Sequence, residues 1–343
     1  MNNKILEKDI LNFSEQFELW EPLRGKSFLI TGATGLIGSI FIKCLLKLNQ
    51  QKDLGIKVVA VVRNIDKAKN VFPESFDKVD FRVLELKNIS KEKINGHIDY
   101  VIHLASPTAS KFFVDYPVET LRTAIEGTIK VLEFAKDSKV EGMIMASSLE
   151  VYGGNDNDEL INEKYQGYVD PLEVRSSYNM GKRAAESLCH AYAKEYQVPV
   201  KIARLTQTTG AGISEDDNRV IVQFSRKVSR GEDIVLHTAG ESARPYCYTI
   251  DAISAMLFIL LRGEKGEAYN VANEDTYISA KGMAEYLKEN FNPNINVRVE
   301  LNDNMGYAPP SKLRLDTRKI KALGWNPKYN LKDIFTNLIS YLC

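Results

Sequence analysis

Two side chains set four residues apart could carry out acid–base chemistry. Tyr178 and Lys182 stand at positions i and i+4 of a stretch with helical spacing, so they share one helix face. An ammonium group beside a phenol favours the phenolate, so Lys182 is expected to lower the pKa of Tyr178 from ~10. A phenol with a lowered pKa suits a general base. Because the pattern is common by itself, it needs support from elsewhere in the chain.

That support lies 30 residues upstream, where Ser147 and Ser148 end an apolar stretch that predicts a strand. A hydroxyl there could share a reacting hydroxyl with Tyr178 and stabilise the alkoxide as a hydride leaves. Glu150 follows at once and places a carboxylate near the same point, although a solvated loop acid is an equal alternative. We take Ser148, Glu150, Tyr178 and Lys182 as the candidate catalytic residues.

A glycine-rich turn near the start of the chain predicts a dinucleotide site. Phe28-Leu29-Ile30 is a buried-strand pattern, and the turn from Thr31 to Gly38 connects it to an apolar helical pattern. Gly32 would allow the tight turn, Gly35 a close approach to a pyrophosphate, and Gly38 close packing of the helix on the strand. The spacing is G-x-x-G-x-x-G, so the flanking strand and helix carry much of the inference.

Strands alternate with helices over the first two thirds of the chain. This alternation predicts a Rossmann-type, doubly wound parallel sheet with ligands at the carboxyl ends of its strands. The predicted strands are 28–30, 58–62, 81–86, 100–105, 143–148 and 200–205, and the clearest helices are 117–137 and 176–197. After residue 206 a looser pattern predicts a smaller mixed lobe.

We therefore divide the chain into three parts. Residues 1–24 form a helical extension on the surface, and residues 25–205 form the dinucleotide-binding domain. Residues 206–343 form the second lobe, which includes predicted strands at 234–236, 246–248, 268–271 and 296–300, and the boundary between the two lobes is expected to be interleaved.

Composition narrows the class of protein. Lys plus Arg and Asp plus Glu both number 45, so no overall charge favours nucleic acid or membrane binding. There is no apolar run of ~20 residues and no signal-peptide pattern. The four cysteines are far apart, which is typical of reduced thiols in a cytoplasmic protein and not of a disulfide frame or a metal site.

Several ordered motifs resemble the extended short-chain dehydrogenase/reductases, and more narrowly the NAD(P)-dependent nucleotide-sugar epimerase/dehydratase family. The resemblance covers about residues 25–340. It is carried by Thr31–Gly38, His103–Pro107, Ser147–Gly153, Tyr178-x-x-x-Lys182, 181–186 and 244–248. The segments 148–153, 181–186 and 244–248 look nearest to the UDP-glucuronate decarboxylase and dTDP-glucose 4,6-dehydratase branches. His103–Pro107 together with Tyr116–Thr120 is more similar to the decarboxylase branch.

The resemblance implies a shared first step. Tyr178 would take a proton from a sugar hydroxyl while hydride passes to the nicotinamide. Lys182 would hold the ribose and Ser148 would bond the reacting oxygen. The resulting keto sugar could be epimerised, dehydrated or decarboxylated before the hydride returns.

The resemblance also assigns the cofactor contacts. They are Gly32, Thr34, Gly35, Leu36, Ile37, Gly38, Arg63, Asn64, Glu85, Leu86, Leu104, Ala105, Ser106, Tyr178 and Lys182. An acid at the end of the second strand favours NAD, whereas an arginine accommodates the 2′-phosphate of NADP. The chain has Arg63-Asn64 there, so NADP is slightly favoured over NAD, although Arg63 could instead stack on the adenine.

The second lobe would hold the nucleoside diphosphate. Arg244 matches the family's diphosphate-binding arginine, and Thr108, Arg219 and Arg314 are further candidates for the substrate site. Guanidinium groups suit phosphate oxygens because they bond them in pairs. The family resemblance also implies a homodimer formed through residues 111–136 and 176–197.

Departures from the family pattern keep the reaction open. Leu149 replaces the acid that precedes Glu150 in the dehydratases and the small hydroxyl residue that precedes it in the decarboxylases, and Ala124 replaces a common Asn. An NADPH-dependent reductase of a keto sugar or nucleotide-linked ketose is therefore an alternative. A non-catalytic, cofactor-sensing scaffold would have no need of Ser148, Tyr178 and Lys182 together.

Overall fold

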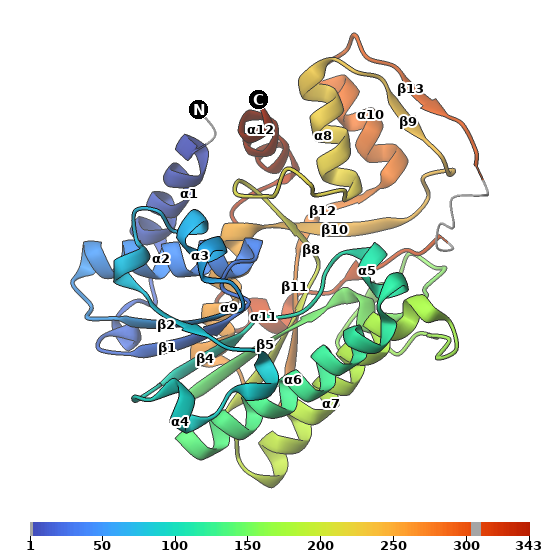
Figure 1. The fold of residues 1–343 in the computed structure, drawn as a ribbon. Helices are drawn as coiled ribbons and strands as arrows, with labels where there is room; N and C mark the ends of the chain where they lie inside the picture. Colours follow the sequence, from blue (N-terminus) through green and yellow to red (C-terminus); the bar gives the residue numbers. More distant parts are fainter. Residues whose placement is uncertain (1–2, 303–309) are drawn as a thin grey trace.

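Seven parallel strands form the central sheet of the computed structural model, which describes residues 3–302 and 310–343 (Figure 1). The strands are β1 (Ser27–Thr31), β2 (Lys57–Val62), β3 (Asp80–Val83), β4 (Tyr100–His103), β5 (Gly142–Ser148), β7 (Val200–Leu205) and β11 (Ala268–Val271). Their order is β11-β7-β5-β4-β1-β2-β3. The order reverses between β1 and β4, which is where an open α/β sheet binds its ligand at the strands' carboxyl ends.

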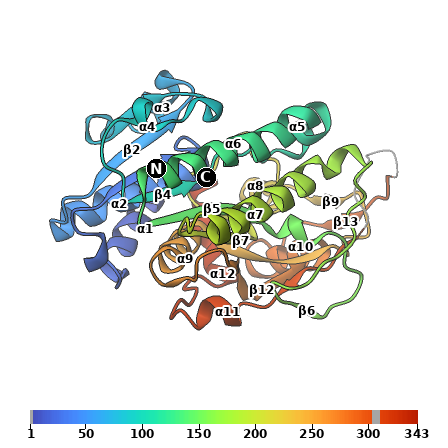
Figure 2. The same cartoon turned by 90° about the horizontal axis from the view of Figure 1, so that it is seen from below.

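Helices cover both faces of this sheet, so its central strands read as continuous apolar runs. Successive residues of β1 face opposite sides: Phe28 and Ile30 belong to one apolar cluster and Leu29 to another. The first cluster packs against α2 (Leu36–Lys52) and α9 (Thr249–Arg262). The second packs against α4 (Lys91–Ile94), α6 (Pro117–Ser138) and α7 (Ser177–Glu195), and α6 and α7 run side by side (Figure 2).

The smaller lobe lies beyond the carboxyl ends of the large sheet (Figure 1). Its core is a three-stranded sheet of β8 (Gln207–Thr209), β10 (Ala243–Tyr248) and β12 (Asn273–Ser279). The other paired strands are β9 (Ile234–Leu236) with β13 (Val297–Val299) and β6 (Leu160–Ile161) with β14 (Arg314–Leu315). Its helices are α8 (Val220–Arg230), α10 (Ala280–Asn290), α11 (Arg318–Lys321) and α12 (Leu331–Leu342).

Short elements complete the chain. They are α3 (Ile65–Val71) and α5 (Ser110–Asp115), with the 3-10 turns η1 (Glu21–Leu23), η2 (Phe76–Lys78), η3 (Leu86–Asn88), η4 (Leu149–Tyr152) and η5 (Val174–Ser176). Two of them matter for the site: η4 follows β5, and η5 leads directly into α7.

The predicted doubly wound parallel sheet is confirmed, with one strand placed wrongly. Residues 268–271 were assigned to the smaller lobe, but they form β11, the edge strand beside β7. A segment of four residues, one of them the polar Asn270, is too short to show which sheet the strand joins, so the sequence could not place it. The predicted strand 81–86 ends at Val83. The division of the chain near residue 205 stays a prediction.

The predicted N-terminal helix is α1 (Asn3–Gln16), and residues 1–2 of the predicted extension lie outside the described part. Leu6, Phe13 and Phe17 of the extension are buried, and α1 packs against α2, α9 and α12. The Tyr248 hydroxyl donates a 2.5 Å hydrogen bond to the buried carboxylate of Asp9. The extension thus joins the cofactor-side helix α2 to the second lobe.

The structure also bears on two expectations from the sequence, which concern disulfide bonds and membrane-spanning helices. All four cysteines are free, with Cys44, Cys189 and Cys247 buried and Cys343 exposed. Across residues 3–302 and 310–343, no helix combines the length and apolar character needed to cross a membrane.

Candidate active site

The glycine turn after β1 has the close packing that its sequence predicts. Gly32 has φ +70°, a left-handed conformation that favours glycine, and a Cβ there would lie 2.8 Å from the backbone nitrogen of Ala105. A Cβ on Gly38 would lie 2.3 Å from the Gly32 carbonyl oxygen. The turn therefore brings the start of α2 against the end of β1, and the helix N-terminus offers its amide groups to an anion such as a pyrophosphate. Thr34, Leu36 and Ile37 lie in this turn and the first helical turn.

The residues predicted to surround the adenosine follow β2 and β3. Arg63 is exposed, and the Asn64 side chain accepts a 2.9 Å hydrogen bond from the backbone N–H of Lys67, which caps α3. Glu85 pairs with Lys87 at 2.7 Å. The hydrogen bond from Lys87, and more weakly the charge of Arg63, lower the pKa of the Glu85 carboxyl.

Other predicted cofactor residues lie at neighbouring strand ends. Leu104 and Ala105 follow β4 and touch the Gly32 turn, and the Ser106 hydroxyl bonds the Pro107 carbonyl. Leu86 packs beside Gly127 of α6.

Tyr178 and Ser148 meet at the carboxyl end of β5. The Ser148 hydroxyl is close enough to act on the Tyr178 phenol, and the Tyr178 side chain is half-buried. Burial raises the pKa of Tyr178 to about 12, the Ser148 hydroxyl opposes the rise, and the charge of Glu150 adds to it. The prediction that Lys182 lowers this pKa is wrong for this structure, because loss of solvation on burial is the largest effect on the phenol and the charge that acts on it is that of Glu150.

Lys182 shares a helix face with Tyr178, as predicted. Its Nζ lies 5.8 Å from the Tyr178 ring centroid and donates a 2.8 Å hydrogen bond to the Ala146 carbonyl oxygen. Burial lowers the pKa of Lys182 to about 8, and the Glu186 carboxylate opposes that shift. The ammonium is thus fixed between α7 and the end of β5.

Glu150 connects the two lobes at this point. Its Oε1 lies 3.7 Å from Nη1 of Arg244, which comes from β10 of the smaller lobe. The Asn179 side chain donates a 2.8 Å hydrogen bond to the backbone carbonyl of Glu150. A carboxylate and a guanidinium from different lobes therefore lie next to Ser148 and Tyr178.

The four predicted substrate residues are not all brought together. Arg219 donates hydrogen bonds to the Asp217 carboxylate. The positive charges of Arg219 and Arg244 both act on the phenol of Tyr246. Burial raises the pKa of Tyr246 to about 12, and both arginines oppose the rise. Arg314 lies over the Tyr277 ring, 5.8 Å from its centroid, and Thr108 is exposed after β4.

The buried residue His103 has a structural role that its sequence motif did not indicate. His103 ends β4 with its Nδ1 2.8 Å from the Thr31 hydroxyl and its Nε2 3.3 Å from the Thr128 hydroxyl. Burial lowers its pKa to about 3, with a smaller contribution from the charge of Lys182. His103 is therefore a neutral link between β1, β4 and α6.

Sequence analysis also missed a buried ion pair. Glu186 of α7 and Arg204 of β7 form three hydrogen bonds of 2.6 to 3.2 Å, and the Ser147 hydroxyl donates a 2.5 Å bond to Glu186. The signal was present in the spacing, because Glu186 follows Tyr178 and Lys182 at successive intervals of four residues.

Leu149 points away from this chemistry. It is 2% exposed and belongs to an apolar cluster that includes Val151, Leu313 and Leu315. From the sequence, Leu149 was interpreted as the replacement of a polar residue beside the substrate. In the structure its side chain is part of the hydrophobic core.

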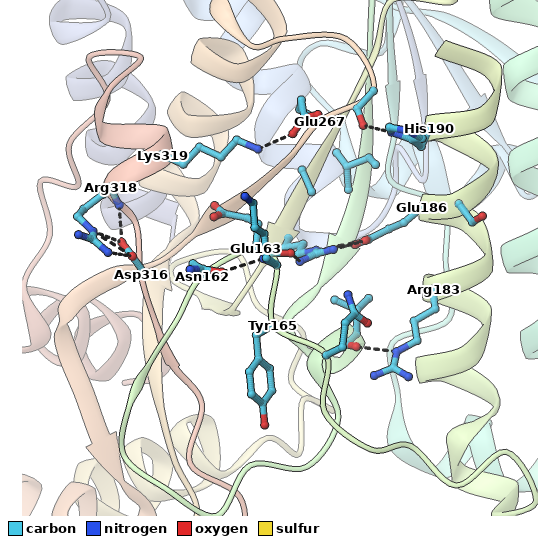
Figure 3. Close-up of a pocket in the computed structure, with 18 residues that line it drawn as sticks. Asn162, Glu163, Tyr165, Arg183, Glu186, His190, Glu267, Asp316, Arg318 and Lys319 are labelled. Atoms are coloured by element: carbon cyan, nitrogen blue, oxygen red, sulfur yellow. Dashed lines mark hydrogen bonds and ion pairs between the residues drawn. The ribbon is translucent and has the colours of Figure 1, made fainter. Parts of the chain in front are cut away.

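A cavity of about 930 Å³ borders α7, and Tyr178 is not among the residues that line it. Figure 3 shows this cavity. Arg183, Glu186 and His190 of α7 line it, with Glu163 and Lys319 opposite. The Glu186–Arg204 pair thus forms one wall of this cavity and, through Ser147, supports the strand end that carries Ser148.

The comparisons with known proteins agree with the motifs. Residues 28–272 match the model of the NAD dependent epimerase/dehydratase family. UDP-glucuronic acid decarboxylase 5 of Arabidopsis thaliana is 30% identical over 328 residues, covering 91% of this chain and 90% of the relative. UDP-glucuronic acid decarboxylase 1 of Danio rerio is 29% identical, covering 92% and 72%.

Two solved structures show the shared fold. The dTDP-glucose 4,6-dehydratase DesIV of Streptomyces venezuelae, solved with NAD and TYD bound, has a TM-score of 0.76 at 21% identity and covers 92% of this chain and 96% of that one. UDP-glucuronic acid 4-epimerase of Bacillus cereus in complex with NAD has a TM-score of 0.74 at 22% identity, covering 92% and 98%.

The buried His103 predicts a loss of stability in acid. Its pKa is about 3 in the fold against 6.5 when unpaired, so below pH 6.5 the unfolded chain binds a proton that the folded chain excludes. Stability should fall as the pH drops from about 6.5 towards 3, by about 2 kcal/mol between pH 7 and pH 5. Urea unfolding of the wild type and His103→Asn at both pH values measures this, and the variant should lose less. His237→Asn, at an exposed histidine, is the control; equal acid losses in all three proteins would contradict the account.

Proposed function

The chain belongs to the NAD dependent epimerase/dehydratase family, and on this premise we propose that it is an enzyme that transforms a nucleotide-linked sugar through a transient keto intermediate. The glycine turn from Gly32 to Gly38 and Lys182 would hold NAD or NADP, which would supply reversible hydride transfer without net consumption of cofactor. The observation that carries the proposal is that Tyr178 and Lys182 share one face of α7, with Lys182 bonded to Ala146 near the end of β5, where Ser148 lies.

The chain's own residues have separate tasks in this scheme. Tyr178 takes the proton of the reacting hydroxyl as its general base, and Ser148 donates a hydrogen bond to the developing alkoxide. Lys182 holds the cofactor's ribose and keeps a positive charge near the phenol. The nearby Ser148 hydroxyl opposes the burial that raises the pKa of Tyr178 to about 12.

Glu150 and Arg244 decide what happens to the keto sugar. Glu150 is the candidate base for a proton next to the ketone, and Arg244 is placed to meet the diphosphate or a carboxylate of the substrate. Leu149 is buried in the core and offers no acid for a departing hydroxyl. Decarboxylation of a nucleotide-linked hexuronate asks least of this site, because a β-keto acid loses CO₂ without such an acid. The relatives named as UDP-glucuronic acid decarboxylases support testing that substrate class first.

An NADPH-dependent reductase is the second candidate, and Arg63 favours it. Arg63 is exposed at the end of β2, where Asn64 is neutral and caps α3. A guanidinium at this position suits the 2′-phosphate of NADP, and the nearby Glu85 is already paired with Lys87. Steady consumption of NADPH during turnover would select this candidate over the first.

Replacing the proposed base should abolish turnover. We expect Tyr178→Phe to lower kcat at least a hundredfold, because general-base catalysis contributes about 10²–10⁴-fold. Mass spectrometry of products from UDP-glucuronate, dTDP-glucose and CDP-glucose, each with NAD⁺ or NADP⁺, gives the measurement. Tyr192→Phe, on the same helix, is the control and should leave the rate unchanged. Full activity of Tyr178→Phe would contradict the proposed role.

Arg63 should set the choice of cofactor. We expect Arg63→Ala to weaken NADP⁺ binding about tenfold and to leave NAD⁺ binding nearly unchanged, because only NADP⁺ carries the 2′-phosphate. Calorimetric titration of both cofactors tests this, with Lys69→Ala of α3 as the control. Equal losses for the two cofactors would instead indicate stacking on the adenine.

We also propose a homodimer built on α6 and α7. The two helices lie side by side, and the exposed apolar residues Tyr116 and Val118 stand at the start of α6. Light scattering should give about twice the 38.7 kDa mass of one chain. Introducing a charge with Val118→Glu should favour the single chain, and a monomeric wild type would contradict this proposal.

A further inference from the structure

The short helix α5 places an aromatic ring on the candidate base. The Phe113 and Tyr178 rings are stacked, with centroids 4.2 Å apart and planes 11° from parallel. Phe113 is 7% exposed and Tyr178 is half-buried, so the stacked ring of Phe113 shields one face of the phenol from water. An offset stack of this kind adds attraction beyond the burial of apolar surface.

A second contact ties the same two segments together through the backbone. The Ser177 hydroxyl donates a 3.2 Å hydrogen bond to the Phe113 carbonyl oxygen. Ser177 immediately precedes Tyr178, and α5 also packs on η5, the turn that leads into α7. Phe113 therefore contacts two successive residues at the point where α7 begins.

We propose that Phe113 is a positioning residue, which holds the Tyr178 phenol against Ser148 by stacking on its ring. Tyr178 lies in the first turn of α7, and the stack limits the rotation of its ring about the side-chain bonds. A phenol with a fixed ring keeps its oxygen within reach of a hydroxyl held at the end of β5, which is what a general base requires. The catalytic part of this inference rests on the proposed function, whereas the contact itself does not.

The stack also bears on the titration of the phenol. Glu150 from η4 and Lys182 from α7 are the charged groups that face Tyr178, and the Ser148 hydroxyl lies near its phenol. Burial raises the pKa of Tyr178, and the Phe113 ring covers one face of the phenol. Removing that ring should admit water and let Tyr178 ionise at lower pH.

Two substitutions separate the ring from simple bulk. Phe113→Leu keeps an apolar side chain but removes the stack, and Phe113→Tyr keeps it. Phe112→Leu is the matched control, because the neighbouring Phe112 ring contacts Tyr116, at 5.0 Å between centroids. Circular dichroism and thermal unfolding establish that each variant is folded, and Phe113→Met replaces Phe113→Leu if the latter is not.

The first measurement needs no substrate. Phenolate absorbance is followed to about pH 11, and each protein is compared with the same protein carrying Tyr178→Phe, so that the difference reports Tyr178 alone. We expect no Tyr178 ionisation in the wild type, Phe113→Tyr or Phe112→Leu, and a clear ionisation in Phe113→Leu. An unchanged difference spectrum in Phe113→Leu, or the same change in Phe113→Tyr, would overturn the inference.

The second measurement is turnover of the best substrate from the product screen. Phe113→Leu should lower kcat about three- to tenfold, the factor that corresponds to one stacked aromatic pair, with little change in KM. A change confined to KM would overturn the positioning role. If Tyr178→Phe keeps full activity while Phe113→Leu still shifts the titration, the proposed function fails and the structural contact stands.

Discussion

The ion pair between Glu186 and Arg204 is the interaction on which the arrangement of the site depends. The side chains of Arg204 and Glu186 are only 8% and 11% exposed, respectively, and Arg204 donates hydrogen bonds to both oxygens of the carboxylate. Removal of either partner would leave a buried charge, which costs about 3–5 kcal/mol. The pair connects α7 to β7, and Ser147 extends it to β5. The helix that carries Tyr178 and Lys182 is thereby held in register with the strand that ends in Ser148.

The same network reaches the smaller lobe. Arg204 donates a 3.1 Å hydrogen bond to the Tyr152 hydroxyl, and Tyr152 bonds the Asn270 side chain of β11. Asn270 in turn bonds the Asp316 carbonyl next to α11. On the other side of η4, Glu150 faces Arg244 of β10. The turn that follows β5 is thus supported by the large sheet and faces the lobe that would hold a nucleotide sugar.

Much of this site was readable from the chain alone, for definite physical reasons. The glycine turn could be predicted from its glycines, because Gly32 and Gly38 occupy positions where the backbone leaves no room for a Cβ. The spacing of Tyr178 and Lys182 follows from the helix period, and Ser148 from the end of a buried strand. The short-range signals of period, turn and burial were sufficient for these residues and for most of the fold.

What the sequence could not give depends on contacts between distant residues. The stack of Phe113 on Tyr178 joins residues 65 positions apart, and nothing in the pattern of 110–115 indicates it. The raised pKa of Tyr178 depends on how deeply the fold buries the phenol, which a local comparison of charges cannot assess. Leu149 looked like a substitution at the site because its neighbours in sequence face the site, whereas its own side chain turns into the core.

The central claim is that a sugar carbon transfers a hydride to the bound nicotinamide cofactor for a short time and then receives the hydride back. The most direct test uses a nucleotide sugar that carries deuterium on the carbon to be oxidised. Labelled UDP-glucuronate is the first substrate to try. A single turnover by the cofactor-loaded enzyme should show a transient absorbance of reduced nicotinamide that forms more slowly with deuterium. The product should retain the label at the oxidised carbon if the hydride returns there. A product that forms without any reduced nicotinamide, or that gains unlabelled hydride from added NADPH, would contradict the account.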